Sequence, residues 1–262
     1  MAAVGERKIS YDARGLAEPN AEVPKVSEVD GAKAVFDARD LTTRQINLEL
    51  RWLLYEQGVT DVTVKNPGSK HSIGVGILTR CKITFEGSLG YFGCGLIDGP
   101  EIHITGRVGW SACENMMSGV VVIEGNAGSL TGAALRGGDL VVKGRVGARS
   151  GIDQKGGTII TLGSAGSMNG FMMQRGRQVI CGDVGPGLGD SMYDGIMYVG
   201  GKVKSLGIDC VEGEWTDADT EFIERKFRIY DLGAPPEFQK FVCGKKLYNY
   251  DNLEPSERKL VL

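Results

Sequence analysis

Glycine recurs every 19 residues through the middle of this chain, and this period constrains the fold more than any other feature. The first glycine of each unit is Gly68, Gly87, Gly106, Gly125, Gly144, Gly163, Gly182 or Gly201. A second glycine follows three residues later at Gly90, Gly109, Gly128, Gly147, Gly166 and Gly185. A period that is kept over so many units predicts a solenoid, in which each unit stacks on its neighbour.

Each unit also holds one short apolar run at a fixed place, such as Val121-Val122-Ile123 or Leu140-Val141-Val142. These runs are too short for helices, and the rest of the unit is rich in turn residues. We therefore predict an all-β protein, a right-handed parallel β-helix with about seven or eight coils between residues 60 and 210. The glycines are expected to be structural, because they supply corners with positive φ and let the backbones of adjacent coils approach closely.

The regions on either side of the repeat lack the 19-residue period. We divide the chain into four parts, two of which precede the repeat's β-helix and one of which follows it. Residues 1–34 form a polar arm, and residues 35–58 contain a capping helix at 42–57 that begins at Thr42 or Thr43 and ends at Gly58. Residues 59–211 form the β-helix, with opening strands expected at Val62-Thr63-Val64 and at residues 73–77. Residues 212–262 contain a helix that starts at Thr216 and an aromatic tail that is expected to dock on the rod or on a partner.

Composition excludes several classes of function. The formal net charge of -3 and the lack of a basic cluster argue against nucleic acid as a partner. The chain contains no apolar stretch long enough to span a membrane and no apolar run near Met1, so we expect a cytoplasmic location. The six cysteines show no C-x-x-C spacing. Cys94 and Cys113 occupy the same place in adjacent coils, where buried thiols are a simpler interpretation than a metal or redox pair.

Motifs for catalysis are absent from the sequence. It contains no phosphate-binding loop, no H-E-x-x-H and no G-x-S-x-G, and we predict no catalytic, cofactor-binding or metal-binding residue in this chain. His71 and His103 are interpreted as structural histidines. A polysaccharide-binding or polysaccharide-cleaving β-helix is an alternative, but it would be expected to have a signal peptide and exposed carboxylates or aromatic rings stacked along one face, and the sequence shows neither feature.

Several segments outside the simple repeat resemble a known family. They are Arg44-Gln45-Ile46-Asn47, residues 66–76, residues 112–119, residues 189–193, residues 203–210 and residues 245–250. Together they resemble the GXGXG domain at the C-terminus of the glutamate synthase large subunit. The closest likeness is to the separate β-helix subunit of N-methylglutamate synthase, and the repeat is also similar to a subunit of formylmethanofuran dehydrogenase.

The resemblance implies a division of labour among subunits. A glutamine amidotransferase-like subunit and a subunit with FMN and iron–sulfur clusters would carry the chemistry of methylamine metabolism in a glutamate synthase-like oxidoreductase complex. This chain would be their structural subunit in a hetero-oligomer, without a cofactor of its own. The alternative within this class is a scaffold subunit of a formylmethanofuran dehydrogenase or formyltransferase/hydrolase complex.

Polar residues that interrupt the repeat are candidates for contacts with those partners. Buried polar groups cost stability unless they are paired, so each candidate either bonds adjacent coils or faces a partner. The candidates are Arg44, Asn47, His71, Glu114, Asn115, Asp190 and Tyr193.

Overall fold

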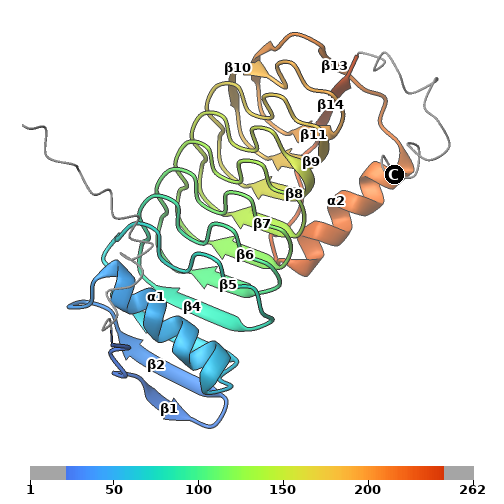
Figure 1. Ribbon diagram of the computed structural model, residues 1–262. Helices are drawn as coiled ribbons and strands as arrows, with labels where there is room; N and C mark the ends of the chain where they lie inside the picture. Colours follow the sequence, from blue (N-terminus) through green and yellow to red (C-terminus); the bar gives the residue numbers. More distant parts are fainter. Residues whose placement is uncertain (1–21, 245–262) are drawn as a thin grey trace, which may run out of the picture.

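The computed structural model describes residues 22–244 and shows a parallel β-helix of about eight turns. Each coil contributes one strand to a long sheet, and the coils rise in sequence order along the rod (Figure 1). The parallel strands of this sheet are β2 (Lys33–Asp37), β3 (Asp61–Lys65), β4 (Lys82–Glu86), β5 (Glu101–Ile104), β6 (Val120–Ile123), β7 (Asp139–Val142), β8 (Lys155–Thr161), β9 (Arg175–Ile180) and β11 (Ile196–Val199). The predicted fold class is confirmed.

The strand register follows the 19-residue period in all but the first full coil, apart from a local shift between Lys155 and Thr158 where β8 pairs with β9. Val121 pairs with Ile102 on one side and with Leu140 on the other. Thr63 pairs with Thr84, which is 21 residues later in the sequence. The first coil is therefore longer than the others, and Gly68 is not the structural counterpart of Gly87.

Alternate residues of each strand face the interior of the rod. Val121 and Ile123 are fully buried, whereas Val122 between them faces outward and is half-buried. Equivalent positions stack from coil to coil, so β-branched side chains fill the interior along its length. Polar side chains also lie inside, at Thr131, Ser150, Gln154, Asn169 and Gln178.

Most repeat glycines are needed for close approach rather than for positive φ. A Cβ added to Gly147 would lie 2.5 Å from the backbone nitrogen of Ser129, and one added to Gly166 would lie 2.6 Å from that of Ala148. Neither glycine has a positive φ, so the predicted corner conformation is wrong for these positions. The left-handed corners fall elsewhere in the coil and include non-glycine residues such as Cys94 and Cys113.

One side of the rod, which we call the turn side, consists mainly of turns, although its last segment includes part of β10 (Val184–Leu188). It comprises residues 71–78, 91–98, 110–117, 129–136, 148–155, 167–174 and 186–193, joined from coil to coil by backbone hydrogen bonds. The prediction of a strand at residues 73–77 is wrong, because this segment forms turns. Ile73 and Ile77 are nevertheless buried in the core, which explains the misleading alternation of apolar residues.

At the N-terminal end, a hairpin and a helix cover the first coil. Strand β1 (Glu28–Asp30) pairs antiparallel with β2, so regular structure begins before the predicted boundary at residue 35. Helix α1 (Thr43–Arg51) continues as a π-helical turn, η2 (Trp52–Glu56). Thr42 and Gln45 form a capping box at its start, and Gly58 follows its end with a φ of 68°. Ile46 and Leu50 are fully buried in the interior core.

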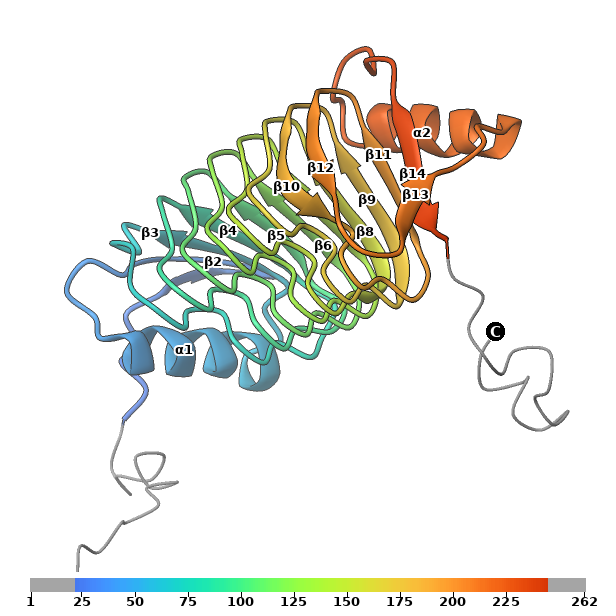
Figure 2. The same cartoon turned by 90° about the horizontal axis from the view of Figure 1, so that it is seen from above.

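At the C-terminal end, an antiparallel strand completes the last coils and a second helix lies against the outer face of the main sheet (Figure 2). A short sheet pairs β10 (Val184–Leu188) with β12 (Val203–Leu206), and β14 (Gln239–Cys243) lies between β11 and β13 (Cys210–Glu212). Helix α2 (Asp217–Ile229) packs Phe222, Ile223 and Phe227 on the outer face of the main sheet. No helix within residues 22–244 is long and apolar enough to cross a membrane.

The predicted docking of the aromatic tail can be described only in part. Phe241 in β14 is buried in the interior core, and Phe238 packs beside α2. Leu247, Tyr248 and Tyr250 lie outside the described residues.

Candidate interaction surface

Two cysteines at the same place in adjacent coils lie inside the rod. Cys94 and Cys113 are fully buried, and burial raises the pKa of the Cys94 thiol to about 12. Burial and the neighbouring Cys94 raise the pKa of Cys113 well above its ordinary value. These groups are therefore thiols at neutral pH and are poor nucleophiles. Among residues 22–244, no three His, Cys, Asp or Glu side chains gather as a metal site would require.

His103 belongs to a row of polar side chains on the outer face of the sheet. Its Nε2 lies 2.8 Å from Oε1 of Glu124, which also forms an ion pair of 3.0 Å with Lys143. Burial by itself would raise the pKa of Glu124, but the hydrogen bonds from His103 and Lys143 outweigh it and lower the pKa. The row links three adjacent strands and agrees with a structural histidine.

Asn47 completes the open edge of the first coil. Its Nδ2 donates to the carbonyl oxygen of Ser72 at 2.8 Å, and its Oδ1 accepts from the backbone nitrogen of Gly74 at 2.9 Å. Thr43 and Arg51, on the same face of α1, donate to the carbonyl oxygens of His71 and Val75. The side-chain amide thus takes the place of a peptide group from a preceding coil, which is a structural role.

His71 begins a stack of three aromatic rings along one margin of the turn side. The ring centroids of His71 and Tyr91 are 4.6 Å apart, and those of Tyr91 and Trp110 are 5.6 Å apart. Both pairs of rings are stacked. Nδ1 of His71 accepts a hydrogen bond from the backbone nitrogen of Tyr91. A Cβ on Gly90, Gly109 or Gly128 would collide with one of these rings.

The prediction from the sequence that no aromatic rings stack along one face is wrong. Tyr91 and Trp110 are 19 residues apart, but His71 precedes Tyr91 by 20 because the first coil is longer. The 19-residue spacing of Tyr91 and Trp110 was the signal that could have revealed part of the stack. Tyr91 and Trp110 are nevertheless 51 % and 55 % exposed.

Asp190 is bonded within the last coils. Its Oδ1 accepts from the hydroxyl of Ser191 at 2.8 Å, and its Oδ2 accepts from the backbone nitrogen of Ile208 at 3.4 Å. The backbone of Gly207 passes so close that a Cβ there would lie 2.2 Å from the Cα of Asp190. This carboxylate holds the final turn of the rod in place.

The remaining candidates lie on the surface. The side chains of Glu114, Asn115 and Tyr193 make no hydrogen bond or ion pair with any residue in 22–244, and all three belong to the turn side. Tyr193 is 44 % exposed. Arg44 is half-buried on α1. The structure therefore brings Asn47 and His71 together at the N-terminal end and places Asp190 and Tyr193 at the other.

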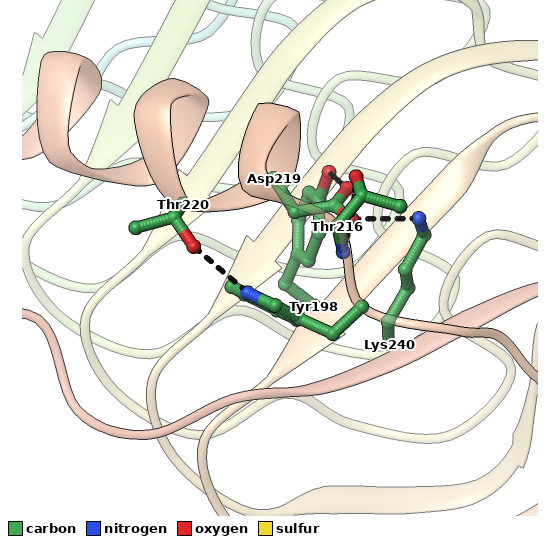
Figure 3. Close-up of polar contacts among 6 residues, drawn as sticks. Tyr198, Thr216, Asp219, Thr220 and Lys240 are labelled. Atoms are coloured by element: carbon green, nitrogen blue, oxygen red, sulfur yellow. Dashed lines mark hydrogen bonds and ion pairs between the residues drawn. The ribbon is translucent and has the colours of Figure 1, made fainter.

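A polar junction that the sequence analysis did not identify fixes α2 to the rod. The Asp219 carboxylate accepts hydrogen bonds from the Tyr198 hydroxyl at 2.7 Å and from Lys240 Nζ at 2.8 Å, and it also caps α2 through Thr216 (Figure 3). Burial alone would raise the pKa of Asp219, but the bonds from Lys240, Tyr198 and Thr216 lower it to about 2. The pKa of Tyr198 is raised by burial and by the adjacent carboxylate.

The other end of α2 is held in a similar way. Nζ of Lys226 lies 2.6 Å from Oδ1 of Asp139 at the start of β7, and the Tyr230 hydroxyl donates to Oδ2 of the same carboxylate. Burial and the Asp139 charge raise the pKa of Tyr230. Both junctions are stabilising contacts between elements and lie on a different side of the rod from the candidate residues.

Comparison with known proteins gives one partial match. Protein GlxC of Rhizobium meliloti (strain 1021) is 39% identical to this chain over 66 residues. The match covers 24% of this chain and 29% of that protein, so the chain spans less than a third of the length of this curated relative. No family model matches the sequence.

Proposed function

We propose that this chain is a non-catalytic structural subunit of a glutamate synthase-like complex. The observation that carries the proposal is the parallel β-helix itself, together with the family-like segments that depart from the repeat. The partial identity with Protein GlxC, 39% over 66 residues, adds support for this proposal. A rod with both ends closed offers a rigid surface on which other subunits can be held in register.

The enzyme we propose is N-methylglutamate synthase, which converts methylamine and glutamate to N-methylglutamate and ammonia. In this proposal the rod bridges an amidotransferase-like subunit and an FMN and iron–sulfur subunit in the cytoplasm. FMN and the clusters belong to the latter subunit. The side chains that depart from the repeat on the turn side, including Glu114 and Asn115, are available for such contacts.

Reconstitution tests the proposal directly. The tagged full-length chain is recovered from its native host and the proteins that co-purify with it are identified. N-methylglutamate formation is then measured with all three subunits and with this chain omitted. We expect the isolated chain to bind no FMN and to show no glutaminase activity, and its omission to abolish or strongly reduce turnover by the other two.

Other results would point elsewhere. Stoichiometric flavin on the isolated chain would contradict a non-catalytic role. Recovery of formylmethanofuran dehydrogenase or formyltransferase subunits would replace the proposed enzyme with the alternative scaffold role. Retention on an acidic polysaccharide without any protein partner would support the polysaccharide-binding alternative.

A further inference from the structure

The exposed side chains of the turn side are largely apolar in its first three coils, and they are small or charged in the two coils that follow. Large apolar side chains point to solvent from the first three coils, and the residue with the greatest exposure among them is Leu78, at 64 %. The others are Tyr91, Leu96, Trp110 and Met117, and Tyr55 at the end of the preceding helix is exposed beside them. The hydroxyl of Tyr55 accepts a hydrogen bond from the backbone nitrogen of Leu78, which places the two residues together.

The next two coils replace these apolar residues with small or charged ones. Ser129 and Ala148 follow Trp110 along the margin that carries the aromatic stack. Arg136 and Lys155 follow Met117 along the opposite margin. Lys155 is neutralised by an ion pair of 2.5 Å with Asp153 and does not leave an isolated charge.

The fold does not require this difference, because the backbone of the turn side follows the same path in these five coils, with left-handed residues at equivalent positions. Ring stacking between His71, Tyr91 and Trp110 stabilises adjacent coils and accounts for part of the aromatic surface. It does not account for Leu78, Leu96 and Met117, whose side chains are about half or more exposed. Gathered exposed apolar side chains mark sites of protein association.

The charge within this surface indicates the chemistry of what covers it. Glu114 lies between Trp110 and Met117 in the same coil, and its carboxylate forms no ion pair with any residue in 22–244. Asp98, in the coil before, accepts a hydrogen bond from the Ser118 hydroxyl. A partner that buries Glu114 must bring a cation to it, since an unpaired buried carboxylate is costly.

This requirement also argues against a second copy of the chain as the occupant. A two-fold contact centred on this surface would bring the Glu114 carboxylates of both copies close together, where like charges repel. A different protein with an apolar surface and one Lys or Arg would bury the exposed apolar side chains and would also pair with the Glu114 carboxylate.

We propose that the turn side of the first three coils is the docking surface for a partner subunit of the complex, whose apolar contact face carries a Lys or Arg that pairs with Glu114. This inference rests on the proposed function, because the partner is one of the two catalytic subunits. Tyr91, Leu96, Glu114 and Met117 would form the centre of the contact.

The test compares variants of the full-length chain for binding to the purified amidotransferase-like and FMN and iron–sulfur subunits. In the first variant Leu78, Leu96 and Met117 are all changed to Ser, and in the second Glu114→Lys reverses the charge. Ile229→Ser is the matched control, because Ile229 is 58 % exposed at the end of α2 on a different side of the rod. Melting temperatures are measured for each isolated variant.

We expect the triple variant and Glu114→Lys each to weaken binding of one catalytic subunit by about tenfold or more, with melting temperatures near that of the wild type. Ile229→Ser should bind as the wild type does. If the wild type and the triple variant bind equally well, the docking assignment is wrong while the proposed function stands. If the wild type binds neither subunit, the proposed function fails and this inference with it. A homodimer that the triple variant abolishes would also overturn the assignment.

Discussion

At the N-terminal end of the rod, side chains of a helix bond the open turn side of the first coil, whereas at the C-terminal end an antiparallel strand and a charged junction complete the last ones. Asn47 supplies one donor and one acceptor to the first coil. Strand β14 supplies a row of backbone groups to β11, and Asp219 joins α2 to β11 and β14.

The two ends show that a terminal coil, which has no neighbouring coil on one side, needs other hydrogen-bond donors and acceptors for its backbone groups. Their source can differ, provided that their spacing matches the coil. A side-chain amide and a backbone strand both meet this need. The N-terminal contact made by Asn47 depends on an uncharged side chain, so the strength of that contact should not change with pH. The C-terminal solution includes a carboxylate with a pKa of about 2, so it should weaken in acid.

The largest loss of stability is expected from a substitution in the middle of the rod that forces adjacent coils apart. Gly147→Val should lower the free energy of unfolding by about 2–4 kcal/mol, because its Cβ would lie 2.5 Å from the Ser129 nitrogen and the coils would have to separate. Chemical denaturation followed by circular dichroism measures the loss.

A matched pair of smaller substitutions, Gly147→Ala and Gly233→Ala, is the control for this prediction. Gly233 has a φ of 78°, but no atom lies within 4 Å of a Cβ placed there. It should therefore cost only about 1 kcal/mol of backbone strain. Equal losses from Gly147→Ala and Gly233→Ala would show that close approach is not the dominant requirement.

The next largest effect should come from the charged junction at the C-terminal end. Asp219→Asn removes the charge that faces Lys240 and replaces one of the two acceptor oxygens by an NH2 group, and we expect a loss of about 2–3 kcal/mol at pH 7. The wild type should lose about 2 kcal/mol of stability as the pH falls from about 4 to 2, since Asp219 has a pKa near 2 in the folded chain and an ordinary one when unfolded.

Thermal unfolding at several pH values separates these effects. The folded-state pKa is depressed, so the contribution is present above pH 4 and is lost in acid. In Asp219→Asn the part of the acid loss that comes from this carboxylate should disappear. A variant with the same acid slope as the wild type would contradict the assignment of that slope to Asp219.

How much of this could be predicted from the sequence depends on whether a residue obeys the repeat. The 19-residue period predicted the parallel coils, and both helices were expected from their capping residues, Thr42 and Thr216. The longer first coil was not predicted, because Gly68 keeps the period by chance while Pro67 takes the place opposite Gly87. Pairings that join distant elements, such as Asp219 with Lys240 and Asp139 with Lys226, leave no periodic signal.

The candidate contact residues illustrate the same limit. Their departure from the repeat was visible, but nothing in the sequence distinguished Asn47, which bonds a neighbouring coil, from Glu114, which does not. The distinction depends on which groups are left unsatisfied at a particular edge. That edge exists only once the coils are stacked.

A smaller effect is expected from the N-terminal end. Asn47→Ala removes one donor and one acceptor from a partly solvated edge and should cost about 1–2 kcal/mol. Asn47→Asp keeps the acceptor for Gly74 but sets a negative charge against the Ser72 carbonyl oxygen, so it should not restore full stability. Hydrogen exchange should show the loss of protection at Gly74. Unchanged protection there would mean that solvent replaces the amide without cost.

The smallest effect on stability should come from turn-side residues whose side chains bond nothing in the rod. Tyr193→Ala and Glu114→Ala should each change the free energy of unfolding by less than about 0.5 kcal/mol, because the groups removed are partly exposed and unpaired among residues 22–244. Asp190→Ala serves as the comparison, since its carboxylate bonds Ser191 and Ile208 and its loss should cost more. If Tyr193→Ala or Glu114→Ala destabilised the isolated chain as much as Asp190→Ala, their roles would be structural. The surface free to contact a partner would then be narrower than the turn side suggests.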